Sequence, residues 1–154
     1  MNNFDSAAIT YQKVIDLNRK IPRELWLRSK LEKLNTNFYS IEEKENQFKK
    51  LLKSDEDRRF RDQINYFYSK FKLSLGDTLA SEKHLKKSLE TLTQDKYLKS
   101  NIYELFAENR MNQIDFVEAG KYFDSTLQNL DEKSLKFRRL KSCLLYTSDA
   151  ADES

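Results

Sequence analysis

A large apolar residue recurs along this chain of 154 residues at intervals of 37, 37 and 38 positions, in a column formed by Tyr11, Phe48, Leu85 and Phe123. Four more columns follow the same intervals: Phe4, Ile41, Thr78 and Phe116; Ile15, Leu52, Leu89 and Leu127; Leu27, Ile64 and Ile102; Leu31, Tyr68 and Phe106. A fixed period of this length is typical of repeat architectures, in which each unit buries its apolar face against its neighbours. The period therefore constrains the fold more than any single motif does.

Each repeat contains two apolar patterns with helical spacing. In the third repeat, the first pattern consists of Phe60, Ile64, Phe67, Tyr68, Phe71 and Leu75. Gly76 and Asp77 interrupt it, and a second pattern runs through Leu85 and Leu89. Because turns this short place consecutive helices side by side, the sequence predicts an all-α fold, an α-solenoid of antiparallel helix pairs over residues 1–142.

Capping residues mark several of the expected helix starts. Ser40 is followed three positions later by Glu43, which is the pattern of a capping box. Asp115 can accept hydrogen bonds from the free amides of the helix that it precedes, and Glu118 places a negative charge near that helix start. Pro22 suits a first helical turn, where no amide donor is needed.

The composition argues against an active site in this chain. Two glycines and one proline are too few for the many turns of an all-β fold. His84 is the only histidine and Cys143 the only cysteine, which excludes a multi-histidine metal site and a disulfide framework. The sequence has no glycine-rich phosphate loop and no apolar run of the roughly 20 residues that a membrane span needs. We therefore expect no enzyme activity, cofactor, metal site or membrane span.

The segment from Cys143 to Glu153 resembles the translation of a transposon-type sequencing adapter. This resemblance predicts that residues 143–154 are a non-native tail, and we expect the tail to be disordered. Without it the net charge rises from +3 to +6, because three of the 25 acidic residues and none of the 28 basic ones lie there. The array also opens on a second helix and ends within a first helix. We therefore expect truncation at both ends, with Phe4, Tyr11 and Leu140 lacking a packing neighbour.

Small and large residues alternate at fixed places in the second helices, at Ala7, Tyr11 and Val14, at Ser81, Leu85 and Ser88, and at Ala119, Phe123 and Thr126. In the first helices a large residue precedes a small one at Tyr68-Ser69 and Phe106-Ala107. This pattern resembles the tetratricopeptide repeat, which implies a scaffold that binds other proteins. Glu32 and Lys44 depart from it at small-residue positions, and the period exceeds the usual length of about 34 residues.

Two stretches, residues 16–27 and 118–127, are similar to the large tetratricopeptide lipoproteins of gliding motility and type IX secretion in gliding bacteria. That resemblance implies a periplasmic parent protein anchored in the outer membrane, with its anchor upstream of this chain. A cytoplasmic location is the alternative. The alternative function is a sensor segment of a regulator whose DNA-binding or catalytic domain lies outside this chain.

In the tetratricopeptide register, the first-helix residues that face the concave groove are Trp26, Ser29, Lys33, Tyr66, Lys70, Leu73, Glu104, Glu108 and Met111. The two lysines among them lie one repeat apart, and with the aromatic residues they would hold an acidic or aromatic peptide. The two glutamates of the next repeat reverse the charge, so a ligand would meet a basic-to-acidic gradient. The alternative for each residue is simple exposure to solvent.

Two basic runs, residues 58–61 and 138–141, carry the charge that a nucleic-acid contact needs. Acidic or apolar residues interleave with both, and the net charge of the repeat region is modest. We expect hydrated helix faces there, protein or peptide partners for the chain, and no nucleic-acid binding.

Overall fold

The computed structural model describes residues 3–92 and 94–153, with side chains from residue 6 onward, so the side chain of Phe4 lies outside the described part. All regular structure in these residues is helical, and they contain no strand, which confirms the predicted all-α class. The α-helices are α1 (Asn3–Asp16), α2 (Arg23–Leu34), α3 (Ile41–Lys53), α4 (Arg61–Ser74), α5 (Thr78–Glu90), α6 (Lys96–Asn112), α7 (Phe116–Leu127) and α8 (Leu135–Asp152). Two short 3-10 helices, η1 (Asn18–Lys20) and η2 (Arg58–Phe60), precede α2 and α4.

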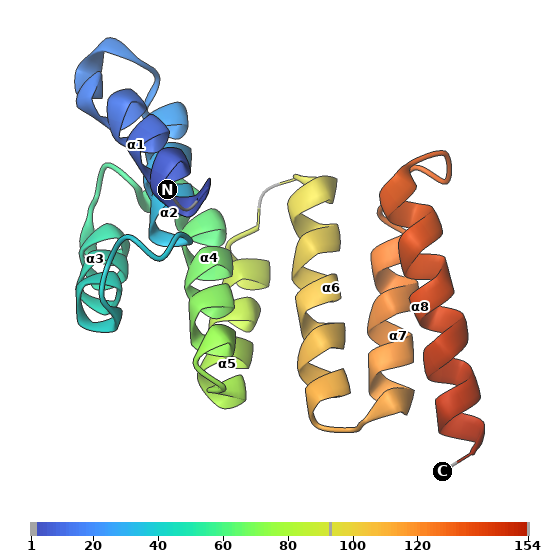
Figure 1. The fold of residues 1–154 in the computed structure, drawn as a ribbon. Helices are drawn as coiled ribbons and strands as arrows, with labels where there is room; N and C mark the ends of the chain where they lie inside the picture. The colour runs from blue at the N-terminus through green and yellow to red at the C-terminus, as the bar shows by residue number, and fades with distance from the viewer. Residues whose placement is uncertain (1–2, 93, 154) are drawn as a thin grey trace.

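The helices follow one another in space in chain order (Figure 1). α6, α7 and α8 stand side by side at one end, α4 and α5 lie in the middle, and α1, α2 and α3 form the other end. The closest packing joins α4 to α5, α6 to α7, α7 to α8 and α1 to α2. Most helices thus pack against a neighbour in sequence, as expected for a chain with short connections.

Three of the four residues of the first apolar column are buried, each on a different helix. Phe48 on α3, Leu85 on α5 and Phe123 on α7 belong to three successive core clusters, and Tyr11 on α1 is half-buried. Stacking of Phe48 on Tyr68, with ring centroids 4.7 Å apart, joins α3 to α4. Residues one period apart, Phe48, Leu85 and Phe123, therefore pack in equivalent core positions along the chain.

Small residues set how closely the paired helices approach. Ser69 on α4 and Ser81 on α5 are both fully buried, and their hydroxyl oxygens lie 2.8 Å apart. Ala107 on α6 and Ala119 on α7, one period later, are also fully buried. Because these side chains occupy little space, the helix backbones can pack against each other directly.

The second repeat departs from this arrangement, since α2 and α3 do not pack closely against each other. Glu32 and Lys44 occupy the positions that the two serines hold in the next repeat, and they are too long and too polar for a tight crossing. α2 packs against α1 instead. It shares with α3 and α4 one apolar cluster, which includes Leu27, Phe48 and Ile64.

The predicted caps are present at the helix starts. The Ser40 hydroxyl accepts from the Glu43 amide at 3.3 Å, and the Glu43 carboxylate accepts from the Ser40 amide at 2.8 Å, which confirms the capping box. Asp115 accepts from the Glu118 amide at 3.2 Å. The α2 helix begins at Arg23, immediately after Pro22.

The segment expected to be a disordered tail is helical, because α8 continues to Asp152. Thr147 is 1% exposed, and Gly120 on α7 leaves the space that α8 occupies, with Thr147 and Leu144 3.6 and 3.8 Å from the position of a Cβ atom. The expectation failed because an apolar stripe on one face packs α8 onto α7. Leu140, expected to lack a neighbour, is buried in the same cluster. The adapter origin of residues 143–154 stays a prediction.

Candidate functional site

The predicted groove contains one pocket of about 220 Å³, called here the inner pocket, which α2, α4 and the start of α6 line together. Its lining residues are Arg28, Glu32, Gln63, Tyr66, Phe67, Lys70, Asp95, Tyr97, Leu98 and Asn101. Of the nine predicted groove residues, the structure brings Tyr66 and Lys70 into this pocket.

Tyr66 and Lys70 form the α4 wall. Tyr66 is half-buried, and burial raises the pKa of its hydroxyl well above the usual range, helped by the negative charges of Glu104 and Glu108. The hydroxyl therefore stays protonated and can donate a hydrogen bond. The Lys70 ammonium lies 5.7 Å from the centroid of the Phe67 ring, and it forms no ion pair with any residue of the described ranges 3–92 and 94–153. Lys70 thus supplies a positive charge that is not held in an ion pair, in a lining that also contains Glu32 and Asp95.

The α6 wall presents a second tyrosine. Tyr97 is exposed, and the Lys136 ammonium of α8 lies 5.2 Å from its ring centroid. The same ammonium donates a hydrogen bond to the side-chain oxygen of Asn101. Aromatic and amide groups of α6 and an ammonium group of α8 therefore meet at this side of the pocket.

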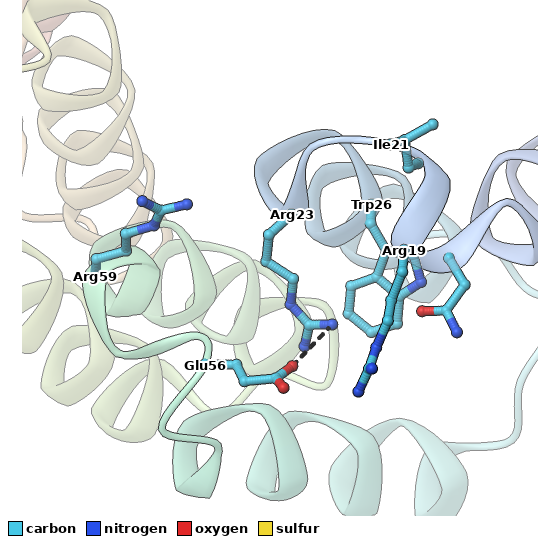
Figure 2. A pocket seen from close by; sticks show the side chains of 7 residues that line it. Arg19, Ile21, Arg23, Trp26, Glu56 and Arg59 are labelled. Carbon is cyan, nitrogen blue, oxygen red and sulfur yellow. Dashed lines mark ion pairs between the residues drawn. The ribbon is translucent and has the colours of Figure 1, made fainter.

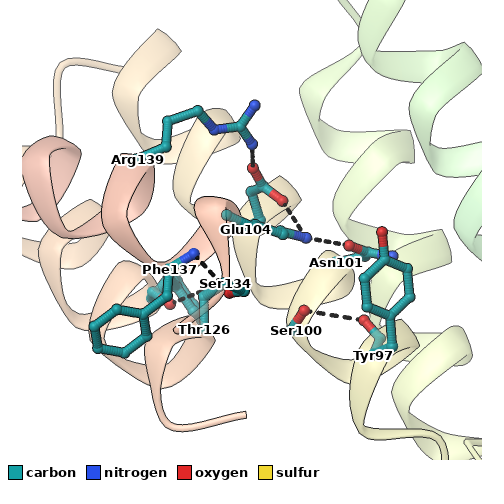
Figure 3. A network of polar contacts seen from close by, with 10 residues as sticks. Tyr97, Ser100, Asn101, Glu104, Thr126, Ser134, Phe137 and Arg139 are labelled. Atoms are coloured by element: carbon teal, nitrogen blue, oxygen red, sulfur yellow. Dashed lines mark hydrogen bonds and ion pairs between the residues drawn. The ribbon is translucent and has the colours of Figure 1, made fainter. Parts of the chain in front are cut away.

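Glu104 is neutralised by α8, as Figure 3 shows. Its carboxylate oxygens lie 2.7 Å from an Arg139 guanidinium nitrogen and 2.8 Å from the Lys136 ammonium. Glu108 is exposed and does not line the pocket; partial burial of its carboxyl and the charge of Glu104 raise its pKa, while the charge of Lys70 opposes this effect. Packing of α8 thus neutralises Glu104, whereas Glu108 keeps an exposed side chain, so only part of the acidic end that the expected gradient required remains.

Lys33, expected to be the basic partner of Lys70 in the groove, is 4% exposed. Its ammonium donates to the Gln12 side chain of α1 at 2.6 Å and lies 4.0 Å from the Phe38 ring centroid. Ser29 is also buried, and its hydroxyl donates to the backbone oxygen of Leu25 at 2.9 Å. Packing of α1 on α2 covers this face, so these two residues do not line an open groove.

The remaining predicted residues lie elsewhere. Trp26 lines a different pocket, between α2 and the segment that precedes α4. Leu73 and Met111 are half-buried beside the second and third core clusters. Leu73 and Met111 are one period apart, as expected, but their side chains pack against the core clusters.

Several pocket residues were missed by the sequence reasoning. A signal for two of them was present, because the column that begins at Trp26 continues at Gln63 and Asn101 with the intervals of 37 and 38. Lys136 and Arg139 lie outside the pocket lining and neutralise Glu104; there was no comparable signal for them in the sequence, because their role depends on the contact between α8 and α6.

The basic runs are partly engaged in internal contacts. Arg139 pairs with Glu104, and a guanidinium nitrogen of Arg61 donates to the backbone oxygen of Leu52 at 3.3 Å. Within the described ranges, no three His, Cys, Asp or Glu side chains are grouped as a metal site would require. None of the helices described here is both long and apolar enough to cross a membrane.

No protein-family model matches this chain, and no curated protein matches it either. The resemblance to tetratricopeptide repeats therefore rests on the spacing of its own residues.

Proposed function

We propose that this chain is a non-enzymatic scaffold for protein–protein interactions, built as an α-solenoid of tetratricopeptide-like antiparallel helix pairs. The close packing of α4 on α5 and of α6 on α7, with small residues at both crossings, supports the repeat assignment. A solenoid of this kind presents the same face of successive helices along one concave surface.

The observation that carries the proposal is the inner pocket. Three first helices contribute to it, and it combines a protonated Tyr66, an exposed Tyr97 and a Lys70 ammonium that is not held in an ion pair. Such a surface binds an extended segment through apolar contact with the rings and a charge-assisted hydrogen bond to a carboxylate. The class of partner is therefore a peptide segment that carries acidic and aromatic side chains.

A fluorescein-labelled peptide of alternating Glu and Phe, titrated with the chain and followed by fluorescence polarisation, tests the groove. We expect Lys70→Glu to weaken binding roughly tenfold or more, because it replaces a charge-assisted hydrogen bond by repulsion. Lys83→Glu, on the exposed face of α5, is the matched control and should bind like the original chain. Equal binding by both variants would remove the groove assignment.

The parent protein is proposed to be one of the tetratricopeptide lipoproteins of gliding motility and type IX secretion, located in the periplasm at the outer membrane. Residues 16–27 and 118–127 support this assignment by their resemblance to that group. Sequencing the uninterrupted parent gene tests it. A signal peptide followed by a lipid-attachment cysteine would support it, whereas an adjoining helix-turn-helix or kinase domain would replace it with the regulator hypothesis.

A further inference from the structure

A second and larger pocket, of about 510 Å³, lies between the connection that precedes α2 and the segment between α3 and α4 (Figure 2). We call it the arginine pocket. It is lined by Asn18, Arg19, Ile21, Arg23, Trp26, Glu56 and Arg59. Its volume lies in the range of pockets that hold small organic ligands.

Arg23 is held rigidly at the centre of this pocket. Its Nε and Nη2 atoms donate to the two carboxylate oxygens of Asp57 at 2.7 and 2.8 Å, and Asp57 is 0% exposed. The guanidinium carbon lies 3.9 Å from the centroid of the Trp26 ring. A guanidinium fixed by a buried carboxylate and an indole loses little freedom when it binds a further group.

The remaining edge of Arg23 is only loosely occupied. Its Nη1 atom lies 3.4 Å from a carboxylate oxygen of Glu56, whose side chain is 69% exposed, and Figure 2 shows this contact as the ion pair within the pocket. This distance is too long for a strong charge-assisted hydrogen bond. Another anion can therefore displace Glu56 from this edge at little cost.

The lining of the pocket carries further positive charge. Arg19 is exposed, forms no ion pair with any described residue, and lies beside Trp26, while Arg59 lies on the opposite side of Arg23 (Figure 2). The Lys30 ammonium lies 5.2 Å from the Trp26 ring centroid. Burial lowers the pKa of Lys30, and so does the positive charge of Arg23. Cations thus outnumber the single carboxylate, that of Glu56, among the lining side chains.

The pocket also has an apolar part. Ile21 and Trp26 are both half-buried and contribute apolar surface to the lining. A bare inorganic ion would leave this apolar surface unused. The lining therefore suits a ligand that carries an oxyanion next to an apolar or aromatic group.

We propose that the arginine pocket binds an organic anion. Its phosphate or carboxylate group takes the place of Glu56 on the free edge of Arg23 and pairs with Arg19, and its apolar part lies against Ile21 and Trp26. The pocket does not overlap the inner pocket, since the two share no lining residue. This proposal therefore does not depend on the peptide groove.

Trp26 is the only tryptophan of the chain, so its fluorescence reports on this pocket alone. The probes are phenyl phosphate and benzoate, with benzyl alcohol as the neutral control, all at constant ionic strength. We expect a saturable fluorescence change with one or both anions and none with benzyl alcohol. The tighter of the two probes assigns the oxyanion as phosphate or carboxylate.

Variants of exposed residues identify the site without disturbing the core. Arg19→Ala should weaken binding roughly tenfold, because it removes a charge-assisted pair. Glu56→Gln should tighten binding roughly two- to fivefold, the size expected for one exposed charge. Arg138→Ala removes the same charge from α8, far along the chain, and should have no effect. Circular dichroism confirms that each variant is folded.

Two results would overturn the proposal. One is a fluorescence change that potassium chloride reproduces at the same ionic strength, which would mean general screening. The other is equal affinity in the original chain, Arg19→Ala and Glu56→Gln, which would place the anion elsewhere.

Discussion

Gly76 and Ile114 occupy the same place in two helix-ending turns, 38 positions apart, and both have left-handed backbone angles, with φ of 78° and 61°. In the first turn the amide of Asp77 donates to the Lys72 carbonyl at 3.0 Å. In the second turn the amide of Asp115 donates to the Arg110 carbonyl at 2.9 Å. Both helices thus end in a Schellman motif. Glycine adopts this conformation freely, whereas a β-branched residue is strained in it.

Replacing Ile114 by Gly should therefore stabilise the chain by about 1 kcal/mol, the usual cost of a left-handed residue with a Cβ atom less the entropy of the added glycine. The Ile114 side chain is 74% exposed, so little packing is lost. The midpoint of urea unfolding measures the effect. Gly76→Ala is the mirror control and should destabilise by a similar amount. A lower midpoint for Ile114→Gly would show that the strain is absent.

The small residues at the α4–α5 crossing lead to a second prediction. Ser81 is 0% exposed and bonds to Ser69 at 2.8 Å and to Asn109 at 3.2 Å. Ser81→Ala should cost about 1 kcal/mol for the lost hydrogen bonds. Ser81→Lys, which introduces the residue that Lys44 supplies one repeat earlier, should cost more than about 3 kcal/mol because it buries a charge. Similar unfolding midpoints for the two variants would argue against a tight crossing.

In the second repeat, the helix positions could be predicted from the sequence, but the way in which α2 and α3 pack could not. The departures at Glu32 and Lys44 were visible in the sequence, but their consequence, the separation of α2 from α3, was not predicted. Local rules such as the Ser40 cap and the apolar columns were sufficient for helix positions, because they involve residues close in sequence. How two helices cross depends on pairs of side chains from different helices.

The same difference between local sequence rules and contacts between helices explains which groove residues were predicted well. The column register put Tyr66 and Lys70 on one face of α4, and both line the inner pocket, because they lie one helical turn apart. It failed for Lys33, which Gln12 and Phe38 cover, and for the charge of Glu104, which α8 neutralises. The repeat pattern predicted both covering helices, α1 and α8, but not which side chains of the neighbouring helices they cover, because that depends on tertiary packing.

His84 should make stability depend on pH. Its Nδ1 atom lies 2.9 Å from the side-chain oxygen of Asn65, and its ring lies 4.1 Å from that of Tyr68. Burial, and then the positive charges around it, lowers its pKa from 6.5 to about 4. The charged groups that face it are Lys87, Lys72, Lys83 and Glu45. In the unfolded chain the ring is protonated below about pH 6.5.

As the pH falls from 6.5 to 4, the unfolded chain therefore takes up a proton that the folded chain does not bind, and stability decreases over this window. Urea midpoints measured from pH 7.5 to 4 should fall for the original chain. His84→Gln, which keeps a donor for Asn65 but cannot titrate, should show a smaller fall. Equal slopes would show that His84 is accessible to protons in the folded chain.

The C-terminal part of α8 should contribute to stability. Truncation after Ser142 removes Leu144 and Thr147, which lie against Gly120 of α7. The half-buried Leu144 and the buried Thr147 should together be worth about 2 kcal/mol of apolar burial. Thermal unfolding of the full and truncated chains compares the two states. Identical melting temperatures would restore the interpretation of residues 143–154 as a disordered tail.

Asp57 should be the acidic residue whose loss costs most, because it is the fully buried partner of Arg23. Asp57→Ala leaves the guanidinium without its bidentate acceptor and should destabilise by about 3 kcal/mol. Glu56→Gln, one position earlier and exposed, should cost less than about 1 kcal/mol. Urea unfolding at pH 7 measures both.

The loss of Asp57 should also act locally, because Asp57 joins the segment before α4 to the start of α2, in the part of the chain where α2 and α3 do not pack closely. Amide exchange should therefore become faster in α1 and α2 before it does so in α6 to α8. Uniform acceleration along the chain would show that this ion pair stabilises the whole fold rather than its first helices.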